Sequence, residues 1–120
     1  MRNVILSALL AATLSAPALA ASYPVSGRWG ESASNEKGAV DCSGLRVISF
    51  NGDQRTDSSG GVPAYRNESV TADGPSRYRI VDVFATGQIS ARTEYTLTVL
   101  DADHIVLQMQ GGTLTLQRCK

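Results

Sequence analysis

The sequence is short of the residues that build most catalytic and metal centres. It holds one histidine, His104, and two cysteines. No second cluster of ligands stands at metal-binding spacing from His104, and neither G-x-S-x-G nor C-x-x-C occurs. The residues therefore predict no enzyme, no metal site and no cofactor. His104 is interpreted as a polar turn residue rather than as a general base.

An excess of charge of either sign is also missing. The chain carries 11 Lys and Arg residues against 11 Asp and Glu residues. Nucleic acids and anionic membranes attract proteins through clustered basic side chains. The balanced and interspersed charges therefore predict neither kind of partner.

Long apolar runs are confined to the first 20 residues. Residues 1–3 carry one positive charge, residues 4–14 are small or apolar, and small side chains stand at Ala18 and Ala20. This order is typical of a secretory signal peptide, so we predict cleavage after Ala20 and a periplasmic or secreted protein. A membrane anchor is the alternative, but the run is shorter than the roughly 20 residues of a spanning helix and Pro17 ends it. Residues 21–120 are then a single domain without a membrane span.

The number and position of the cysteines agree with the predicted export. Cys42 lies near the start of the mature domain, and Cys119 is its last residue but one. In an oxidising compartment an even pair most simply forms a disulfide, with two free thiols or a metal pair as the alternatives. Closing so long a loop stabilises a fold by roughly 4 kcal/mol in the chain-entropy model. A domain of about 100 residues, which holds one small core, benefits from such reinforcement.

The C-terminal half has the alternation of a β-meander. Four β-branched or alternating runs cover residues 78–84, 89–99, 105–110 and 113–118. Turns are predicted at Gly87-Gln88, at residues 101–103 and at Gly111-Gly112, because glycine and aspartate suit tight hairpin loops.

These turns fix the registers of three hairpins. Directly opposed residues share a face, so the registers gather the apolar side chains of all four strands on one surface, and a slip by one residue would break that agreement. The predicted opposed pairs are Phe84 and Ala91, Ile80 and Tyr95, Tyr78 and Leu97, Val99 and Ile105, Leu97 and Leu107, Tyr95 and Met109, Met109 and Leu114, and Leu107 and Leu116. The other, solvated surface is predicted to carry Arg79, Arg92, Glu94, Thr96, Thr98, Gln108, Thr115 and Gln117.

The N-terminal half is less regular. Strands are predicted within residues 25–31 and 45–50, followed by a hairpin signal at Asn51-Gly52. Residues 53–62 are rich in Asp, Ser and Gly and are interpreted as a turn or mobile loop, and residues 62–71 supply one or two further strands. Seven or eight short strands predict an all-β fold, a small antiparallel meander β-barrel or a sandwich.

Both ends of the domain resemble the lipocalins and their small, calycin-like bacterial relatives. The chain has Gly27-Arg28-Trp29 on its first predicted strand and Arg118-Cys119 at the end of its last. The resemblance implies that Gly27, Trp29 and Arg118 close one end of the barrel, with the Arg118 guanidinium over the Trp29 indole, and that Cys42–Cys119 staples it. It further implies a non-enzymatic, monomeric domain of the cell envelope that binds a small apolar ligand or an envelope protein. The chain is shorter than a typical lipocalin, which leaves open whether the barrel is hollow or filled.

A G-x-W followed by a cysteine in a small exported barrel also resembles the Inh-type bacterial metalloprotease inhibitors. That resemblance implies a protein-binding inhibitor of a protease or hydrolase that inserts its N-terminal residues into the partner's cleft. The disulfide of those inhibitors lies nearer the N-terminal half, so the position of Cys119 argues against this assignment.

Two polar residues fall on the apolar surface and face each other, Asp82 and Thr93. A carboxylate inside a barrel must be hydrogen-bonded or solvated. We therefore consider Tyr78, Asp82, Thr93 and Tyr95 as a candidate ligand site. The alternative is that Asp82 lies near the open rim or pairs with a nearby Arg or Thr.

Overall fold

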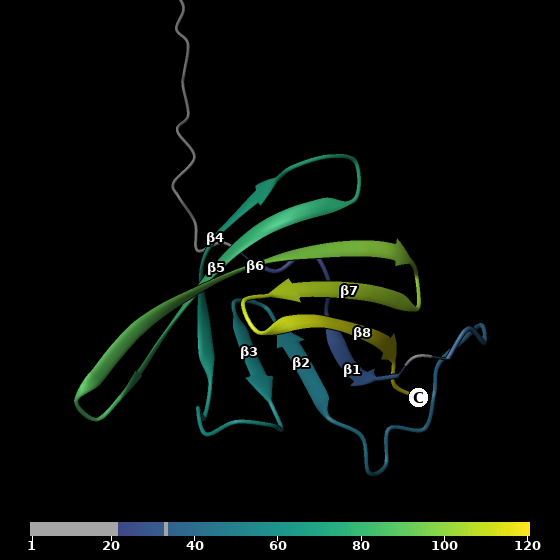
Figure 1. The fold of residues 1–120 in the computed structure, drawn as a ribbon, viewed down its shortest axis with the longest axis horizontal. Coiled ribbons are helices and arrows are strands. Elements are labelled where there is room, and N and C mark those ends of the chain that lie inside the picture. The colour runs from purple at the N-terminus through teal and green to yellow at the C-terminus, as the bar shows by residue number, and fades with distance from the viewer. Residues whose placement is uncertain (1–21, 33) are drawn as a thin grey trace, which may run out of the picture.

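The structure, a computed structural model, describes residues 22–32 and 34–120, so the predicted signal peptide lies outside the described residues. Eight strands follow one another, each antiparallel to the next, and β8 pairs back with β1 to close a barrel (Figure 1). The prediction of an all-β, small antiparallel meander barrel is confirmed. The strands are β1 (Gly27–Glu31), β2 (Val47–Asn51), β3 (Gln54–Asp57), β4 (Tyr65–Ala72), β5 (Arg77–Thr86), β6 (Ile89–Asp101), β7 (His104–Met109) and β8 (Gly112–Arg118).

The β5–β6 hairpin has the predicted register along its whole length. It closes on Gly87-Gln88, with Gly87 at φ +57°, a conformation that few residues other than glycine adopt. Phe84 lies opposite Ala91, Ile80 opposite Tyr95, and Tyr78 opposite Leu97. The next hairpin has two of its three predicted pairs, Val99 opposite Ile105 and Leu97 opposite Leu107. Its ladder ends at Thr96 and Gln108, so the predicted pairing of Tyr95 with Met109 is not part of it.

The turn between β6 and β7 differs from its prediction in detail. Asp101 pairs with His104, so the loop has the two residues Ala102-Asp103, and Leu100 is an extra residue between Val99 and Asp101. An extra residue of this kind is a β-bulge, which leaves one side chain without an opposed partner. Leu100 is consequently 57% exposed, and the cross-strand neighbour of His104 is Asp101.

The predicted β7–β8 register is wrong by two residues. Met109 lies opposite Gly112 and Leu107 opposite Leu114, so the loop is Gln110-Gly111 and not Gly111-Gly112. Gly112 begins β8 at φ +143°, outside the range of ordinary L-residues. A shift of two keeps every side chain on its predicted face, because side chains alternate with a period of two.

The segment interpreted as a turn or mobile loop contains a strand. β3 forms because Asn51 pairs with Gln54 across Gly52-Asp53, and the ladder continues with Phe50 opposite Arg55. Arg55 thereby shares the inner face with Phe50. Residues 62–71 contribute one strand, β4, whose register with β5 shifts at a bulge between Asn67 and Ser69.

The contact between Trp29 and Arg118 that the resemblance implied is present at one end of the barrel. Trp29 pairs with Arg118 across β1 and β8, and the Arg118 guanidinium carbon lies 4.4 Å from the centroid of the indole. The guanidinium also donates to Ala102 O at 2.9 and 3.1 Å. Gly27 has φ +93°, and a Cβ at Gly27 would lie 3.5 Å from Arg118. The predicted contact among these three residues is therefore present.

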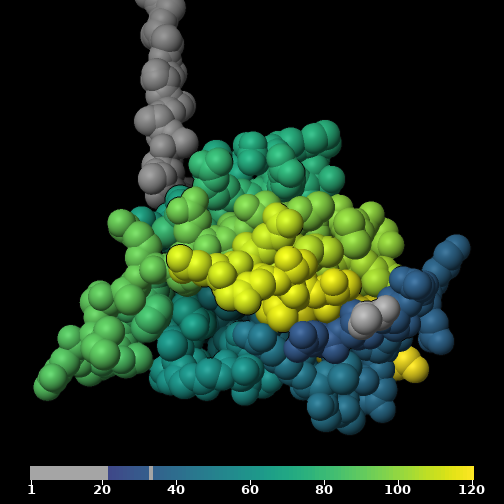
Figure 2. All heavy atoms as spheres, viewed as in Figure 1, coloured from purple at the N-terminus to yellow at the C-terminus, as the bar shows by residue number. Residues whose placement is uncertain are grey.

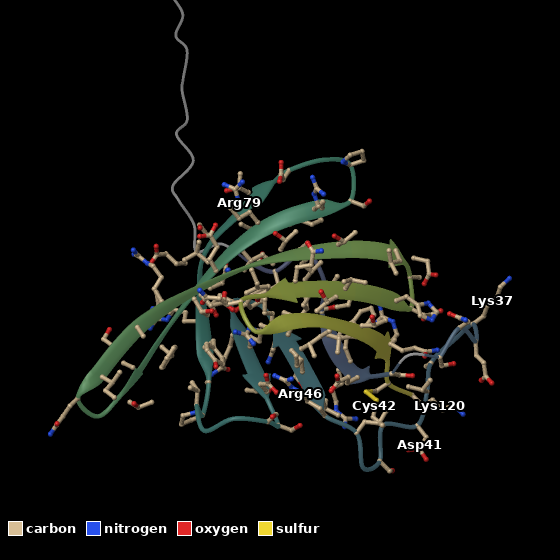
Figure 3. The ribbon with its side chains drawn as sticks, in the orientation of Figure 1. Lys37, Asp41, Cys42, Arg46, Arg79 and Lys120 are labelled. Atoms are coloured by element: carbon tan, nitrogen blue, oxygen red, sulfur yellow. A yellow bond between two sulfur atoms is a disulfide. The ribbon has the colours of Figure 1, made fainter. Side chains whose placement is uncertain are left out.

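The predicted disulfide between Cys42 and Cys119 is also present, and it crosses directly over β1. A Cβ at Gly30 would lie 2.6 Å from Cys42 Sγ, so only glycine leaves room for the bridge. Cys42 precedes β2 in the chain, while residue 40 pairs beside the end of β8. Figure 3 shows the sulfur bond at the end of the barrel that holds the C-terminus, near Lys120. The bridge thus fixes the segment that leads into β2 against the last strand.

Gln117 does not lie on a solvated surface as predicted. It is completely buried, because the segment between β1 and β2 folds over it. Its Nε2 donates to Glu36 O and Gly38 O, both at 2.9 Å, and its Oε1 accepts from Ser32 at 3.2 Å. Alternation gave the correct outward face, but a loop covers that face here.

The tip of the β5–β6 hairpin extends beyond the rest of the barrel (Figures 1 and 2). β5 pairs with β4 only as far as Val83, and β6 pairs with β7 only from Thr96 onward. We call residues 84–94 the projecting ribbon.

Candidate functional site

A buried carboxylate, Asp82, stands at the centre of a polar cluster inside the barrel. Its Oδ2 accepts hydrogen bonds from Arg55 Nε at 2.7 Å and from the Tyr95 hydroxyl at 2.9 Å. Its Oδ1 accepts from the Tyr23 hydroxyl at 2.9 Å and from Asn67 Nδ2 at 3.1 Å. Four donors satisfy most of what a carboxylate can accept. We call these five residues the interior network.

Five separate segments position the network. Arg55 comes from β3, Asn67 from β4, Asp82 from β5 and Tyr95 from β6. Tyr23 precedes β1 and is anchored by its own N–H, which donates to Gly52 O at 3.1 Å. The bulge that follows Asn67 lets its amide reach Ser69 O and Val81 O as well as Asp82. The network therefore forms only when most of the barrel is assembled.

The network leaves little accessible space at this end of the barrel. Asp82 is 0% exposed, Arg55 1% and Tyr95 2%. Side chains that lined a water-filled lumen would retain accessible surface, so the interior around Asp82 is filled by side chains. The Arg55 guanidinium also lies over two rings, 3.9 Å from the centroid of Tyr65 and 5.0 Å from that of Tyr95.

Burial and charge shift the titration of the groups around Asp82. Burial raises the pKa of Tyr95 well above its ordinary value of 10, with Arg55 opposing the shift and Asp82 adding to it. The pKa of Tyr23 is raised by burial and then by the Asp82 charge and hydrogen bond. Burial acts to lower the pKa of Arg55, but the neighbouring Tyr95 and Asp82 outweigh it and the pKa is raised. At neutral pH both tyrosines are therefore neutral, and the Arg55 guanidinium, which keeps its charge, lies 2.7 Å from Asp82 Oδ2.

Of the four predicted ligand-site residues, the structure brings two into direct contact, Asp82 and Tyr95. Thr93 is the backbone partner of Asp82 across β5 and β6, and it is half-buried and lines a hollow beside the edge of β6. Tyr78 pairs with Leu97 and packs against the apolar core. Binding of a ligand by these residues stays a prediction, while the pairing of Asp82 with a nearby arginine, the alternative considered above, is present.

Three residues of the network, Tyr23, Arg55 and Asn67, were missed by the sequence analysis. Arg55 could have been found, because closing the hairpin on Gly52-Asp53 places it opposite Phe50 and hence inside. Asn67 depends on a bulge, which alternation does not predict. Tyr23 lies in a segment with no strand pattern, and its position follows only from the assembled barrel.

A cleft of about 550 Å³ lies at the rim of the barrel, outside the filled interior and beside the network, where β5 runs on past the start of β4. Such a volume is in the range of about 300–1,000 Å³ that is usual for small-molecule sites. Two aromatic rings line the cleft, since Tyr65 and Phe84 make an edge-to-face pair with centroids 5.2 Å apart. The other lining residues are Asp53, Gln54, Ala64, Arg66, Val83, Ala85 and Ser90.

Tyr65 connects this outer cleft to the interior network. One residue thus lines the cleft and contacts the guanidinium of Arg55 through its ring. The network fixes Arg55, and Arg55 in turn supports the ring of Tyr65 from within. The cleft is therefore lined by an aromatic pair that Arg55 contacts from the interior, and by one acidic and one basic residue, Asp53 and Arg66.

His104 forms a local pair with Asp101, Nδ1 lying 2.8 Å from Asp101 Oδ1, and this contact lowers the pKa of the carboxyl. Among residues 22–32 and 34–120, no group of three His, Cys, Asp or Glu side chains is placed to hold a metal ion. The same part of the chain contains no helix long and apolar enough to cross a membrane.

Comparison with known proteins gives no relative for this chain. No family model matches it, and neither a curated protein nor a solved structure gives a significant match.

Proposed function

We propose that this chain is an exported, non-enzymatic, lipocalin-like domain that binds a small, largely apolar ligand in the outer cleft rather than within the barrel. The observation that carries the proposal is the pairing of a filled interior with an aromatic-lined cleft directly outside it. Export is supported by the residue pattern of the first 20 positions and by the Cys42–Cys119 disulfide.

The cleft suggests the chemistry of its ligand. Tyr65, Phe84 and the neighbouring Ala and Val side chains favour a flat apolar body, which would stack on or against the rings. The rim residues Arg66 and Asp53 lie where a polar group of the ligand would remain partly solvated. We therefore expect an aromatic or polyene body with one hydrogen-bonding end.

The proposal can be tested with an uncharged fluorescent probe, N-phenyl-1-naphthylamine. Ala85 lines the cleft and is exposed, so Ala85→Trp should fill the cleft without overpacking the core. We expect at least a tenfold weaker probe affinity, measured by fluorescence titration. Ala72→Trp, at an exposed site on the far end of β4, is the matched control and should bind as the unsubstituted protein does. Equal affinity in all three proteins would refute binding in the cleft.

Binding of a protein is the second candidate function, and one observation favours it. The projecting ribbon offers a protruding surface that a partner could grip. Insertion of the N-terminal residues into a protease cleft is not supported, because Tyr23 is buried in the interior network. An inhibitor built on this fold would have to use the ribbon instead.

A further inference from the structure

The projecting ribbon leaves one edge of β6 without a neighbour. Within residues 22–32 and 34–120, β7 pairs with β6 only from Thr96 onward, so residues 89–95 have β5 on one side and no strand on the other. An unpaired strand edge is a template for another strand. The free stretch of seven residues is about as long as an ordinary strand of five or six.

The backbone groups that point out of this edge can be identified. The Val99 N–H donates to Ser76 O at 2.8 Å, towards β5. Backbone groups of successive residues point to alternate sides of a strand, and the β5–β6 ladder has no register shift from Arg77 to Thr86. The N–H and C=O groups of Ser90, Arg92 and Glu94 therefore point away from β5, towards the open edge.

The usual protection of such an edge is weak here. Residues 89–95 contain no proline and no lysine. The charges of Arg92 and Glu94 are engaged on the outer face, Arg92 with Glu68 at 2.8 Å and Glu94 with Arg79 at 3.6 Å. A hollow of about 540 Å³ runs beside the edge, and the apolar side chain of Ile89 at the ribbon tip is 61% exposed.

We propose that two copies of this chain associate through this edge, with β6 antiparallel to β6 of the second copy and Ala91 on the two-fold axis. The inference is independent of the proposed function, since the outer cleft lies at the opposite, β5 edge of the ribbon. It departs from the monomer expected from the sequence.

Charge and space select this register. Opposed residues lie on the same face of the sheet, so a two-fold axis perpendicular to the sheet pairs odd-numbered residues with odd-numbered ones and even with even. The midpoint of each pair is then a residue, and the axis passes through one residue of the free stretch. Centring on Arg92 would set two arginines opposite each other, which is destabilising. Centring on Thr93 would bring Ser90 of the second copy to Thr96, where Gln108 already pairs.

Centring on Ala91 avoids both conflicts. It places Ser90 opposite Arg92 of the second copy, and these two residues carry the outward-pointing backbone groups deduced above. It also places the exposed Ile89 against Thr93 of the second copy, beside a hollow that includes Met109. The arrangement is isologous, so it closes at two copies and uses the edge of each. Since one strand pair buries less than the roughly 1,200 Å² of a standard interface, the dimer should be weak and concentration-dependent.

Two variants test the association. Proline at residue 92 removes one outward N–H, and that group makes no bond to β5, so Arg92→Pro should abolish the dimer while leaving the monomer folded. Arg92→Ala, which keeps the N–H, is the control and should dimerise. Sedimentation velocity over a concentration series measures the association, and the urea unfolding midpoint verifies that the Arg92→Pro monomer is intact.

Cysteine cross-linking tests the register. Ala91 would face its own copy in a pair without backbone hydrogen bonds, where the Cα atoms are about 4.5 Å apart, within the range of a disulfide. Ala91→Cys should therefore form a covalent dimer on mild oxidation, much faster than the exposed control Thr71→Cys. A protein that sediments as a monomer up to about 1 mM, or that dimerises equally as Arg92→Pro, would overturn the proposal. Equal cross-linking at residues 71 and 91 would overturn the register.

Discussion

The two ends of the barrel interior are filled by different means. At the closed end, the indole of Trp29 is buried as part of the hydrophobic core, and the Arg118 guanidinium lies over it. At the end beneath the projecting ribbon, one carboxylate and one guanidinium are buried with four hydrogen bonds to the carboxylate. Trp29 at one end and Asp82 and Arg55 at the other are almost completely buried.

The two kinds of interior differ in how strictly they require particular side chains. Apolar packing is non-directional and scales with the area removed from water. A buried ion pair gains little net stability over apolar residues of equal volume, but losing one partner is strongly destabilising. We therefore expect the apolar part of the core to tolerate substitution by apolar side chains of similar volume. In the network, we expect Arg55 and Asp82 to be replaceable only together.

Removing the network's carboxylate should have the largest effect. Asp82→Ala leaves the Arg55 guanidinium buried without its charge partner, which should lower the free energy of unfolding by about 3–5 kcal/mol. Urea denaturation with tryptophan fluorescence measures the loss. The double variant Arg55→Met/Asp82→Leu should recover most of the lost unfolding free energy. If it were no more stable than Asp82→Ala, the instability would not come from the unpaired charge, and the contrast with apolar packing would fail.

Truncation in the apolar part of the core should have a somewhat smaller and additive effect. Leu107 is completely buried among aliphatic neighbours, and Leu107→Ala should cost about 3 kcal/mol through lost burial and a cavity. The same urea measurement applies. Leu107→Met, which preserves volume, should cost under about 1.5 kcal/mol. If Leu107→Met were as unstable as Leu107→Ala, the apolar part of the core would tolerate substitution no better than the network does.

The disulfide depends on Gly30, because a side chain at that position would collide with Cys42 Sγ. Gly30→Ala sets a methyl group against Cys42 Sγ, and overpacking of this kind costs about 1–3 kcal/mol. In a Cys42→Ala/Cys119→Ala background the sulfur is gone and the penalty should shrink. A double-mutant cycle of unfolding free energies measures the coupling, and strict additivity would argue against the close approach of residue 30 to the bridge.

The smallest effect is expected from one hydroxyl of the network, and it depends on pH. Tyr95→Phe removes one of four donors to Asp82 and should cost about 1–2 kcal/mol at pH 7. Because the folded-state pKa of Tyr95 is raised, the stability that it contributes is complete below the unfolded pKa of about 10 and is lost as the pH rises above it.

Tyr95→Phe should therefore show a shallower fall of unfolding free energy between about pH 10 and 12 than the unsubstituted protein. Leu107→Ala, which is destabilised but keeps every tyrosine, is the control and should retain the steeper slope. Identical slopes in all three proteins would mean that Tyr95 is not held neutral by the network.

The same contrast explains what the sequence could predict. Alternation and the Gly87-Gln88 turn were enough for the β5–β6 register, because one buried face permits no odd shift. They could not separate registers that differ by two, as at Leu107 and Leu114, since both keep the same face inside. The Trp29–Arg118 contact was predictable from a resemblance carried by a few residues at each end.

The polar end was harder to foresee because its partners are far apart in the sequence. Asp82 stood out as a polar residue on an apolar face, but Tyr23 lies 59 residues from it and Arg55 lies 27. Arg55 also sits in a segment whose Ser, Asp and Gly content indicated a loop. The sequence therefore shows that a buried polar residue needs hydrogen-bond partners, but the identity of those partners follows only from the assembled barrel.

The central claim is that the barrel interior is structural and that small apolar ligands meet the protein outside it. Intermolecular nuclear Overhauser effects between N-phenyl-1-naphthylamine and the isotope-labelled protein test this most directly. We expect contacts from the probe to the rings of Tyr65 and Phe84 and none to the methyl groups of Leu97 and Leu107. Contacts to those two leucines, with none to the cleft, would contradict it.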